Sequence, residues 1–361
     1  MRRQSFLNSL GLLTPILTVL LVVPVMMADS GGNHKVSSDS YGVSGGNVND
    51  RSSLFCCSGT LGSLLTDGTK QYILSNNHVL GRSGQAQAGE DVSQPGLIDN
   101  GCRVAETVAD FTTAPTLGRS NVDAAIAELR SGAMRADGAI LDIGTISSVV
   151  RTATVGLAVT KSGRTTGNTK GTVQAVNANV SVQYQQGCGK GKKFTVSFTN
   201  QVVITPGGFS AGGDSGSLIV TDDACNQPVA LLFAGSSSST IGNPIGQVLT
   251  EVGRSLGRSV SFVGDNCSTS TAVRVTPNGN LALQLSQEVI DLATNAMNER
   301  KNELMARPAV IGVGVGASDS DPYSASIVIF VDNTTGLTPK LPKRIKGVDV
   351  KVIYTDPFVA Y

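Results

Sequence analysis

The spacing of apolar residues changes along the chain. Over much of its length, short apolar runs such as residues 72–80 and 230–236 are separated by stretches rich in Gly, Ser, Thr and Asn. This pattern predicts many short strands joined by turns. Between Leu285 and Met305 the apolar residues are instead three or four positions apart, which predicts an amphipathic helix. Strand-like runs follow at 309–315, 326–331 and 348–354. We therefore expect a β-rich region followed by a small α/β unit.

The first 28 residues differ from the rest of the chain. Arg2 and Arg3 precede an apolar run from Leu10 to Ala28, as in signal peptides. We expect residues 1–28 to direct export to the periplasm, the cell surface or the medium. They would act as a cleaved signal peptide or, if uncleaved, as an anchor, the one case in which we expect membrane contact. Residues 29–50 are mostly Gly, Ser, Asn and Asp and predict a flexible linker.

Length and composition favour an exported protein with more than one domain. The 361 residues exceed a typical single core. We assign residues 51–266 to an all-β domain and residues 281–361 to a small α/β accessory domain. The 42 glycines and 4% aromatic residues suit short strands and turns. The 28 Lys and Arg nearly balance the 27 Asp and Glu, so no basic face predicts a nucleic-acid partner.

We expect neither a cofactor nor a metal. Gly312, Gly314 and Gly316 superficially match a dinucleotide-binding fingerprint, but the predicted helix precedes the strand there and none follows. The adjacent Cys56 and Cys57 have no second histidine nearby that could complete a zinc site.

The segment Gly212–Leu218 reads GGDSGSL and supplies a candidate nucleophile, Ser215. A serine hydroxyl attacks a carbonyl only if a base takes its proton and positioned N–H donors meet the oxyanion. The glycines allow a tight, donor-presenting turn, whereas the alternative interpretation is an ordinary surface loop. Of the two histidines, His34 lies in polar sequence and is expected to be solvated and without a role. His78 follows a strand-like run and is the candidate base.

The third catalytic group must be a carboxylate that fixes the imidazole tautomer. Asp123 lies in the apolar segment NVDAAIAEL and is the strongest candidate, because a buried acid there needs a partner. The alternatives lie in more polar sequence and are Asp91, Asp99 and Asp110. Asp123 could instead cap a short helix of Ala and Ile.

The order and spacing of His78, Asp123 and Ser215 resemble those of the chymotrypsin/trypsin-like serine proteases. The resemblance covers roughly residues 54–262. Further motifs in order are similar to a bacterial branch related to the plant narrow-leaf-type trypsin-like proteins; they are Gly59–Gly62, Leu74–Leu80, Gln94–Gly96, Val122–Ala127 and Lys161–Gly167. The resemblance implies two antiparallel β-barrels, with His78 and Asp123 on the first and Ser215 on the second.

The resemblance also implies roles around the nucleophile. The backbone N–H groups of Gly213 and Ser215 would form the oxyanion hole. Asp214 would be structural, and in family members activated by cleavage it pairs with a new amino terminus. No such cleavage site is evident near Cys56 and Cys57.

Substrate preference can be inferred from the expected pocket. Phe209, six residues before the nucleophile, would line its floor, where a trypsin has Asp, so selection for Lys or Arg is not expected. The strand at 230–236 would pair with substrate backbone, with Phe233, Ala234 and Gly235 at the pocket wall. We expect a small or apolar substrate side chain.

Six cysteines are compatible with disulfides formed outside the cytoplasm. Several pairings are possible, and Cys188 with Cys225 in the second barrel is one of them.

Two functions follow from these observations. The first is an exported serine endopeptidase that hydrolyses polypeptides through an acyl-enzyme intermediate. The second is a catalytically silent, protease-like binding or scaffold protein. The intact Ser-His-Asp set favours catalysis. In addition, the C-terminal domain could cover the cleft as an inhibitor. The sequence gives no indication of oligomeric state.

Overall fold

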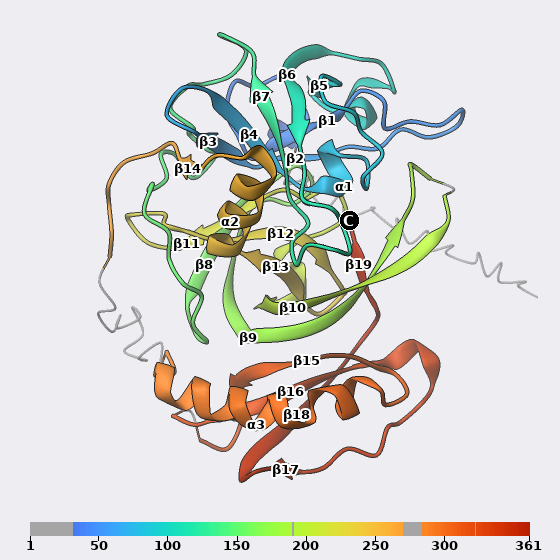
Figure 1. Cartoon of the computed structure of the whole chain (residues 1–361), viewed down its shortest axis with the longest axis vertical. Helices are drawn as coiled ribbons and strands as arrows, with labels where there is room; N and C mark the ends of the chain where they lie inside the picture. The colour runs from blue at the N-terminus through green and yellow to red at the C-terminus, as the bar shows by residue number, and fades with distance from the viewer. Residues whose placement is uncertain (1–31, 190, 270–283, 322) are drawn as a thin grey trace, which may run out of the picture.

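The computed structural model of the protein describes residues 32–189, 191–269, 284–321 and 323–361. One sheet lies at one end of the molecule, a second in the middle, and the C-terminal α/β unit at the other end (Figure 1). The predicted signal segment, residues 1–28, lies outside the described residues. No helix within those ranges is long and apolar enough to cross a membrane.

The first sheet is antiparallel and has eight strands among the described residues, in the order β14-β3-β4-β7-β6-β5-β1-β2. They are β1 (Val43–Asn47), β2 (Gly59–Leu61), β3 (Ser63–Thr66), β4 (Gln71–Ser75), β5 (Asp91–Gln94), β6 (Glu106–Thr113), β7 (Ala125–Leu129) and β14 (Ser261–Phe262). The apolar side chains of these strands form one core, in which Leu64, Ile73 and Ile126 are fully buried. Because β4 lies beside β7, Ser75 pairs with Ala125.

The second sheet carries the strands that lie between residues 158 and 244. They are β8 (Ala158–Gly163), β9 (Gly167–Gln185), β10 (Lys193–Thr205), β11 (Leu218–Thr221), β12 (Pro228–Gly235) and β13 (Thr240–Pro244). These strands pair antiparallel with one another. Helix α2 (Ile245–Leu256) follows β13 and buries Val248 and Val252 in the core of the first sheet, which joins the two sheets. The expected all-β fold is confirmed.

The prediction of a flexible linker over residues 29–50 is wrong where the structure describes that segment. Residues 43–47 form β1, which is buried throughout and pairs with both β2 and β5. The Gly45-Gly46 pair of this strand is typical of flexible sequence, but Gly45 serves close packing instead. A side chain at Gly45 would lie 2.4 Å from Leu61 Cγ, so only glycine lets the strands approach this closely.

The prediction that His34 is solvated is also wrong. Its side chain is 1% exposed, and its Nε2 lies 2.8 Å from Ser162 Oγ and 3.4 Å from Asp142 Oδ2. Burial lowers the pKa of His34 below its ordinary value, although Asp142 opposes the shift. The contact fastens the N-terminal segment to β8.

The C-terminal unit contains the predicted helix and strands. They are α3 (Gln287–Met305), β15 (Val310–Ala317), β16 (Ala325–Asp332) and β18 (Val348–Thr355), with an additional short strand, β17 (Arg344–Ile345). The Ser286 side chain caps α3 by accepting a hydrogen bond from the backbone N–H of Val289. This unit does not have a sheet of its own, because β15 pairs antiparallel with β9 and extends the second sheet.

The last strand, β19 (Phe358–Ala360), leaves the C-terminal unit and returns to β9 and β12 of the second sheet. It pairs antiparallel with β12 and parallel with β9. The end of the chain therefore lies beside α1 (Asn77–Leu80), far from α3 (Figure 1).

Three disulfides cross-link the described residues, and the suggested Cys188–Cys225 pair is wrong. The bonds are Cys56–Cys102, Cys57–Cys188 and Cys225–Cys267. Cys188 lies in the connection between β9 and β10 and is bonded to Cys57, which lies in the loop between β1 and β2 of the first sheet. Cys225 lies elsewhere, in the turn between β11 and β12. Disulfides of this kind are typical of proteins that fold in an oxidising compartment.

Candidate active site

His78 lies on α1, directly after β4. The amide side chains before it fix this turn: Asn76 Nδ2 donates to Asp123 O at 2.6 Å, and Asn77 Nδ2 donates to Pro115 O at 2.8 Å. These bonds satisfy backbone carbonyls and hold the helix against the segment that leads into β7. The imidazole is consequently held at the C-terminal end of β4.

Asp123 contacts His78 as predicted. Its carboxylate is fully buried, with Oδ2 2.6 Å from His78 Nδ1, and Oδ1 accepts the backbone N–H of His78 at 3.2 Å. The backbone N–H of Asp123 donates to Asn243 Oδ1 at 2.9 Å. The helix-cap alternative is wrong, because the residues that follow form strand β7.

The other aspartates considered for this place have different partners. Asp91 and Asp110 both bind Arg130, and Asp99 forms a two-point ion pair with Arg164. None of these three contacts His78 among the described residues.

Ser215 lies in the turn between the 3-10 segment Gly207–Phe209 and β11. Its hydroxyl donates to Phe233 O at 3.3 Å, and His78 Nε2 lies 2.9 Å from the backbone oxygen of Tyr361. In this structure the predicted nucleophile and the predicted base therefore each have another partner. The backbone oxygen of Tyr361 occupies the place on His78 Nε2 at which the predicted Ser215–His78 contact would form.

The turn before Ser215 presents backbone donors, as the oxyanion-hole prediction requires. Thr165 Oγ1 donates to Gly212 O at 2.7 Å, and Ser217 Oγ donates to Asp214 O at 2.7 Å. Because a trans peptide points its N–H opposite its C=O, these bonds direct the N–H groups of Gly213 and Ser215 away from them. Gly213 has φ +99°, which favours glycine. Neither N–H forms a hydrogen bond among the described residues, so two donors remain for an oxyanion.

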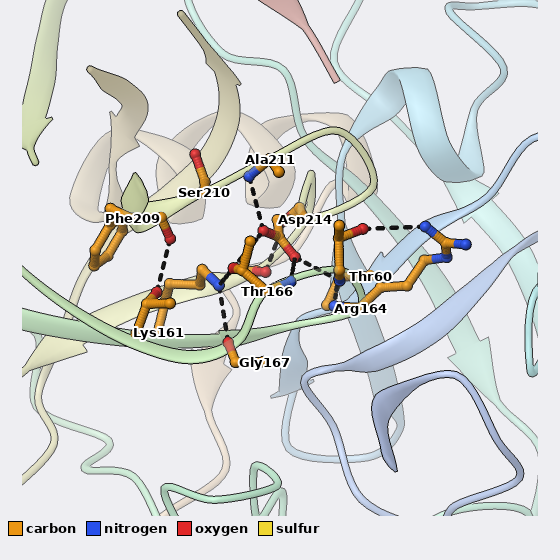
Figure 2. Close-up of polar contacts among 12 residues, drawn as sticks. Thr60, Lys161, Arg164, Thr166, Gly167, Phe209, Ser210, Ala211 and Asp214 are labelled. Carbon is orange, nitrogen blue, oxygen red and sulfur yellow. Dashed lines mark hydrogen bonds and ion pairs between the residues drawn. The ribbon is translucent and has the colours of Figure 1, made fainter. Parts of the chain in front are cut away.

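Asp214 is held by an internal cation. It is fully buried, and its Oδ2 lies 3.5 Å from Nζ of Lys161, which is also buried (Figure 2). Thr166 Oγ1 donates to Asp214 Oδ2 at 2.7 Å, and the backbone N–H groups of Thr165 and Ala211 donate to the carboxylate. The charge of Asp214 is therefore compensated without a new amino terminus.

Tyr184 is a site residue that the sequence analysis missed. It lies on β9, and its hydroxyl donates to Asp123 Oδ2 at 2.8 Å. Burial, with the charge of Asp123, raises the pKa of Tyr184 well above its ordinary value, so the hydroxyl stays protonated and donates. Its ring also meets the His78 ring edge-on. A tyrosine in a long strand carries no local pattern that would reveal this contact.

Replacing Tyr184 with Phe tests whether it positions the carboxylate. A hydrogen bond to a charged group contributes about 1.5–3 kcal/mol, so kcat/KM for the peptide hydrolysis that the resemblance implies is expected to fall about tenfold or more. Loss of the donor also concentrates charge on Asp123 and raises the pKa of His78. The acid limb of the pH–kcat/KM profile should therefore move to higher pH. An unmoved limb would show that Tyr184 only fills space.

The pKa of His78 reflects several opposing effects. Burial lowers it, but the charge of Asp123, the hydrogen bond to that carboxylate and the contact with Tyr361 O together hold it above its ordinary value. The charge of Asp50 also raises the pKa of His78, and burial raises the pKa of Asp50 itself to about 6. Both ring nitrogens face oxygen acceptors, so the protonated imidazole binds the C-terminal segment, residues 358–361, more tightly than the neutral imidazole does. This extra stabilisation of the bound segment is lost as pH rises through the raised pKa of His78.

The predicted substrate-binding residues occupy two kinds of position. Ala234 and Gly235 pair with the backbone of β19. Phe233 contributes its carbonyl to Ser215, while its ring packs against Phe198. Phe209 is buried and lies near the Lys161 ammonium, in an apolar cluster against which Tyr361 packs. Their roles toward a substrate stay predictions.

The two sheets, with His78 and Asp123 beside the first and Ser215 beside the second, have the arrangement of the chymotrypsin-like double β-barrel fold. A cavity of about 250 Å3 between them is lined by His78, Gly213 and Tyr361, among others.

Comparison with solved structures finds similar chains among bacterial proteases. A glutamic-acid-specific serine protease is 24% identical, over 62% of this chain and 98% of that chain, with a TM-score of 0.43. Thermobifida fusca protease A is 18% identical, over 63% and 100%, with a TM-score of 0.41. Nocardiopsis protease is 17% identical, over 63% and 99%, with a TM-score of 0.41. No protein-family model and no curated protein matches the chain.

Proposed function

We propose that the protein is an exported serine endopeptidase. The observation that carries this proposal is the buried Asp123 carboxylate, 2.6 Å from His78 Nδ1, beside a turn with two unused N–H donors next to Ser215. Folding does not require free N–H groups in this turn together with an imidazole oriented by a carboxylate. Acyl transfer requires both, because the base must take the serine proton and the N–H groups must stabilise the oxyanion. The three disulfides and the predicted signal peptide support export.

The reaction follows from these positions. Ser215 Oγ attacks the peptide carbonyl carbon while His78 Nε2 takes the hydroxyl proton, and Asp123 stabilises the resulting imidazolium. The N–H groups of Gly213 and Ser215 stabilise the tetrahedral oxyanion. His78 then protonates the leaving amine, the C–N bond breaks, and an acyl ester remains on Ser215. Water, deprotonated by His78, attacks this ester, and its breakdown releases the new carboxyl group and restores Ser215.

Covalent labelling with a fluorophosphonate tests this proposal. We expect the probe to label Ser215 in the purified protein, more rapidly in the Tyr361→Gly variant, because loss of the ring contacts holds the backbone of residue 361 less tightly beside His78. Labelling should be lost in Ser215→Ala and His78→Ala, and mass spectrometry of the labelled peptide locates the adduct. If folded Tyr361→Gly protein is not labelled, the catalytic proposal fails and a silent binding or scaffold protein becomes the better interpretation.

A further inference from the structure

The final residues of the chain add a strand to the site. Val359 pairs with Gly235 and Ala360 with Ala234 in antiparallel register on β12, while Phe358 pairs with Val182 on the other side. Extended peptides commonly bind in this way, with backbone hydrogen bonds giving affinity and side-chain pockets giving specificity. The groove between β9 and β12 is therefore shaped for an extended polypeptide, and β19 fills it.

Tyr361 continues this strand to the base. Its backbone oxygen is 2.9 Å from His78 Nε2. In the proposed reaction the oxygen beside Nε2 is that of the attacking water, which becomes bonded to the backbone carbon of the acyl-side residue. An oxygen on the Tyr361 backbone carbon at this place, at the end of a strand paired with β12, therefore puts Tyr361 in the position of the acyl-side residue. Its side chain therefore indicates what the adjoining pocket accepts.

The Tyr361 ring enters beside Gly235. A Cβ at Gly235 would lie 2.2 Å from Tyr361 Oη and 2.7 Å from Cζ, so glycine is needed for the ring to pass. The hydroxyl donates weakly to Ser236 O at 3.4 Å and meets the side chain of Ser210. Ser210 Oγ is itself fixed by Thr240 Oγ1 at 2.5 Å.

Two carboxylates, those of Asp214 and Asp356, act on the Tyr361 hydroxyl at the end of this pocket. Asp214 is already paired with Lys161, and Asp356 accepts hydrogen bonds from the backbone N–H and the hydroxyl of Ser237. A lysine ammonium would find both carboxylates engaged, and a glutamate side chain would meet like charge, each at a desolvation cost. A neutral ring with a terminal hydroxyl finds both apolar packing and hydrogen-bond partners, so the pocket suits tyrosine.

The rest of the strand is anchored on both sides. Phe358 is fully buried, and its ring packs edge-on against Phe330 of β16 at a centroid distance of 5.5 Å. Asp356 Oδ1 accepts the backbone N–H of Ser237 at 2.9 Å, and Thr355 Oγ1 lies 2.7 Å from Ser236 Oγ. The C-terminal unit thus helps to build the subsite for Phe358.

From these contacts we infer that residues 358–361 bind as the acyl-side segment of a substrate. The site accordingly takes extended polypeptides with a tyrosine, or a closely related ring, before the scissile bond, and the chain's own tail competes with them. This inference rests on the proposed endopeptidase function.

Peptide binding tests the inference without requiring catalysis. The probe is acetyl-Phe-Val-Ala-Tyr, and the protein is the Ser215→Ala/Tyr361→Gly variant, studied by calorimetry. We expect saturable binding at least about tenfold tighter than that of matched peptides ending in Lys or Glu. Ser215→Ala protein with the native tail should bind the probe about a hundredfold more weakly, because the tail occupies the groove. Equal affinity for the three peptides would overturn the inference.

Measurement of kcat and KM is the second test of the inference. Its substrates are reporter amides of Phe-Val-Ala-X, in which X is Tyr, Phe, Lys or Glu. Tyr361→Gly should lower KM for the Tyr reporter about tenfold or more relative to wild type, with kcat little changed. Tyr361→Phe should give an intermediate KM. Tyr354→Ala, which removes an exposed tyrosine from β18, is the matched control and should behave as wild type.

The outcomes separate the two proposals. Labelling of Ser215 together with a preference for the Lys or Glu reporter, or with an unchanged KM in Tyr361→Gly, overturns the inference and leaves the endopeptidase. Selective binding of the Tyr peptide without any labelling supports the groove assignment and overturns the endopeptidase.

Discussion

Replacing Asp123 with Asn is expected to lower kcat/KM for peptide hydrolysis about 10^4-fold while the protein stays folded. Asp123 Oδ2 accepts the Nδ1 proton of His78 at 2.6 Å, and Oδ1 accepts the backbone N–H. An amide of the same shape cannot accept at both places with equal strength, and it carries no charge to stabilise the imidazolium. The imidazole then favours the wrong tautomer, with Nε2 protonated and unable to take the serine proton.

The measurement is kcat/KM of the Asp123→Asn and parent proteins, both carrying Tyr361→Gly so that the C-terminal segment holds the groove less tightly. Asp110→Asn is the matched control, because Asp110 binds the exposed Arg130 and should leave the rate within about twofold. Circular dichroism establishes that both variants are folded. A loss of less than about tenfold in Asp123→Asn would mean that another group orients the base.

The second large effect is expected on stability, from Lys161→Met. Removing this ammonium leaves the buried Asp214 carboxylate without its cation, which costs about 3–5 kcal/mol in comparable buried pairs. Lys161 also donates to Gly167 O at 2.9 Å and contacts Thr166 Oγ1, so three interactions are lost together. Burial lowers the pKa of Lys161, and Asp214 opposes that shift, as expected of a desolvated pair.

Urea unfolding of Lys161→Met measures this loss as a shift in midpoint. Lys170→Met provides the comparison, because Lys170 is 67% exposed in its ion pair with Asp222 and its removal should cost at most about 1 kcal/mol. Adding Asp214→Asn to Lys161→Met removes the uncompensated charge and should restore part of the stability. Equal midpoints for the two lysine variants would contradict the proposed role of the buried pair.

The groups that we propose to react could be predicted from the sequence because they fall in local patterns. Ser215 is surrounded by glycines, and His78 follows a strand-like run. Asp123 was separable from other aspartates because apolar residues flank it. The all-β fold followed from short apolar runs between turn residues.

The supporting contacts could not be predicted, because they join distant segments without a local pattern. Tyr184 lies 61 residues from Asp123, and its alternating strand gives no sign of the contact. Lys161 belongs to the motif Lys161–Gly167, but nothing in that motif predicts that its ammonium is buried beside Asp214. Residues 43–47 were taken for linker because a Gly-Gly pair is as typical of flexible sequence as of a tightly packed strand.

The short connection between β18 and β19 has a thermodynamic consequence. β18 ends at Thr355 and β19 begins at Phe358. A ligand held by so short a tether has an effective concentration of about millimolar or more. Occupancy of the groove by the tail is therefore independent of protein concentration, and dilution cannot free it. Only a free peptide present near that effective concentration, or an event that separates β19 from β9 and β12, would change it.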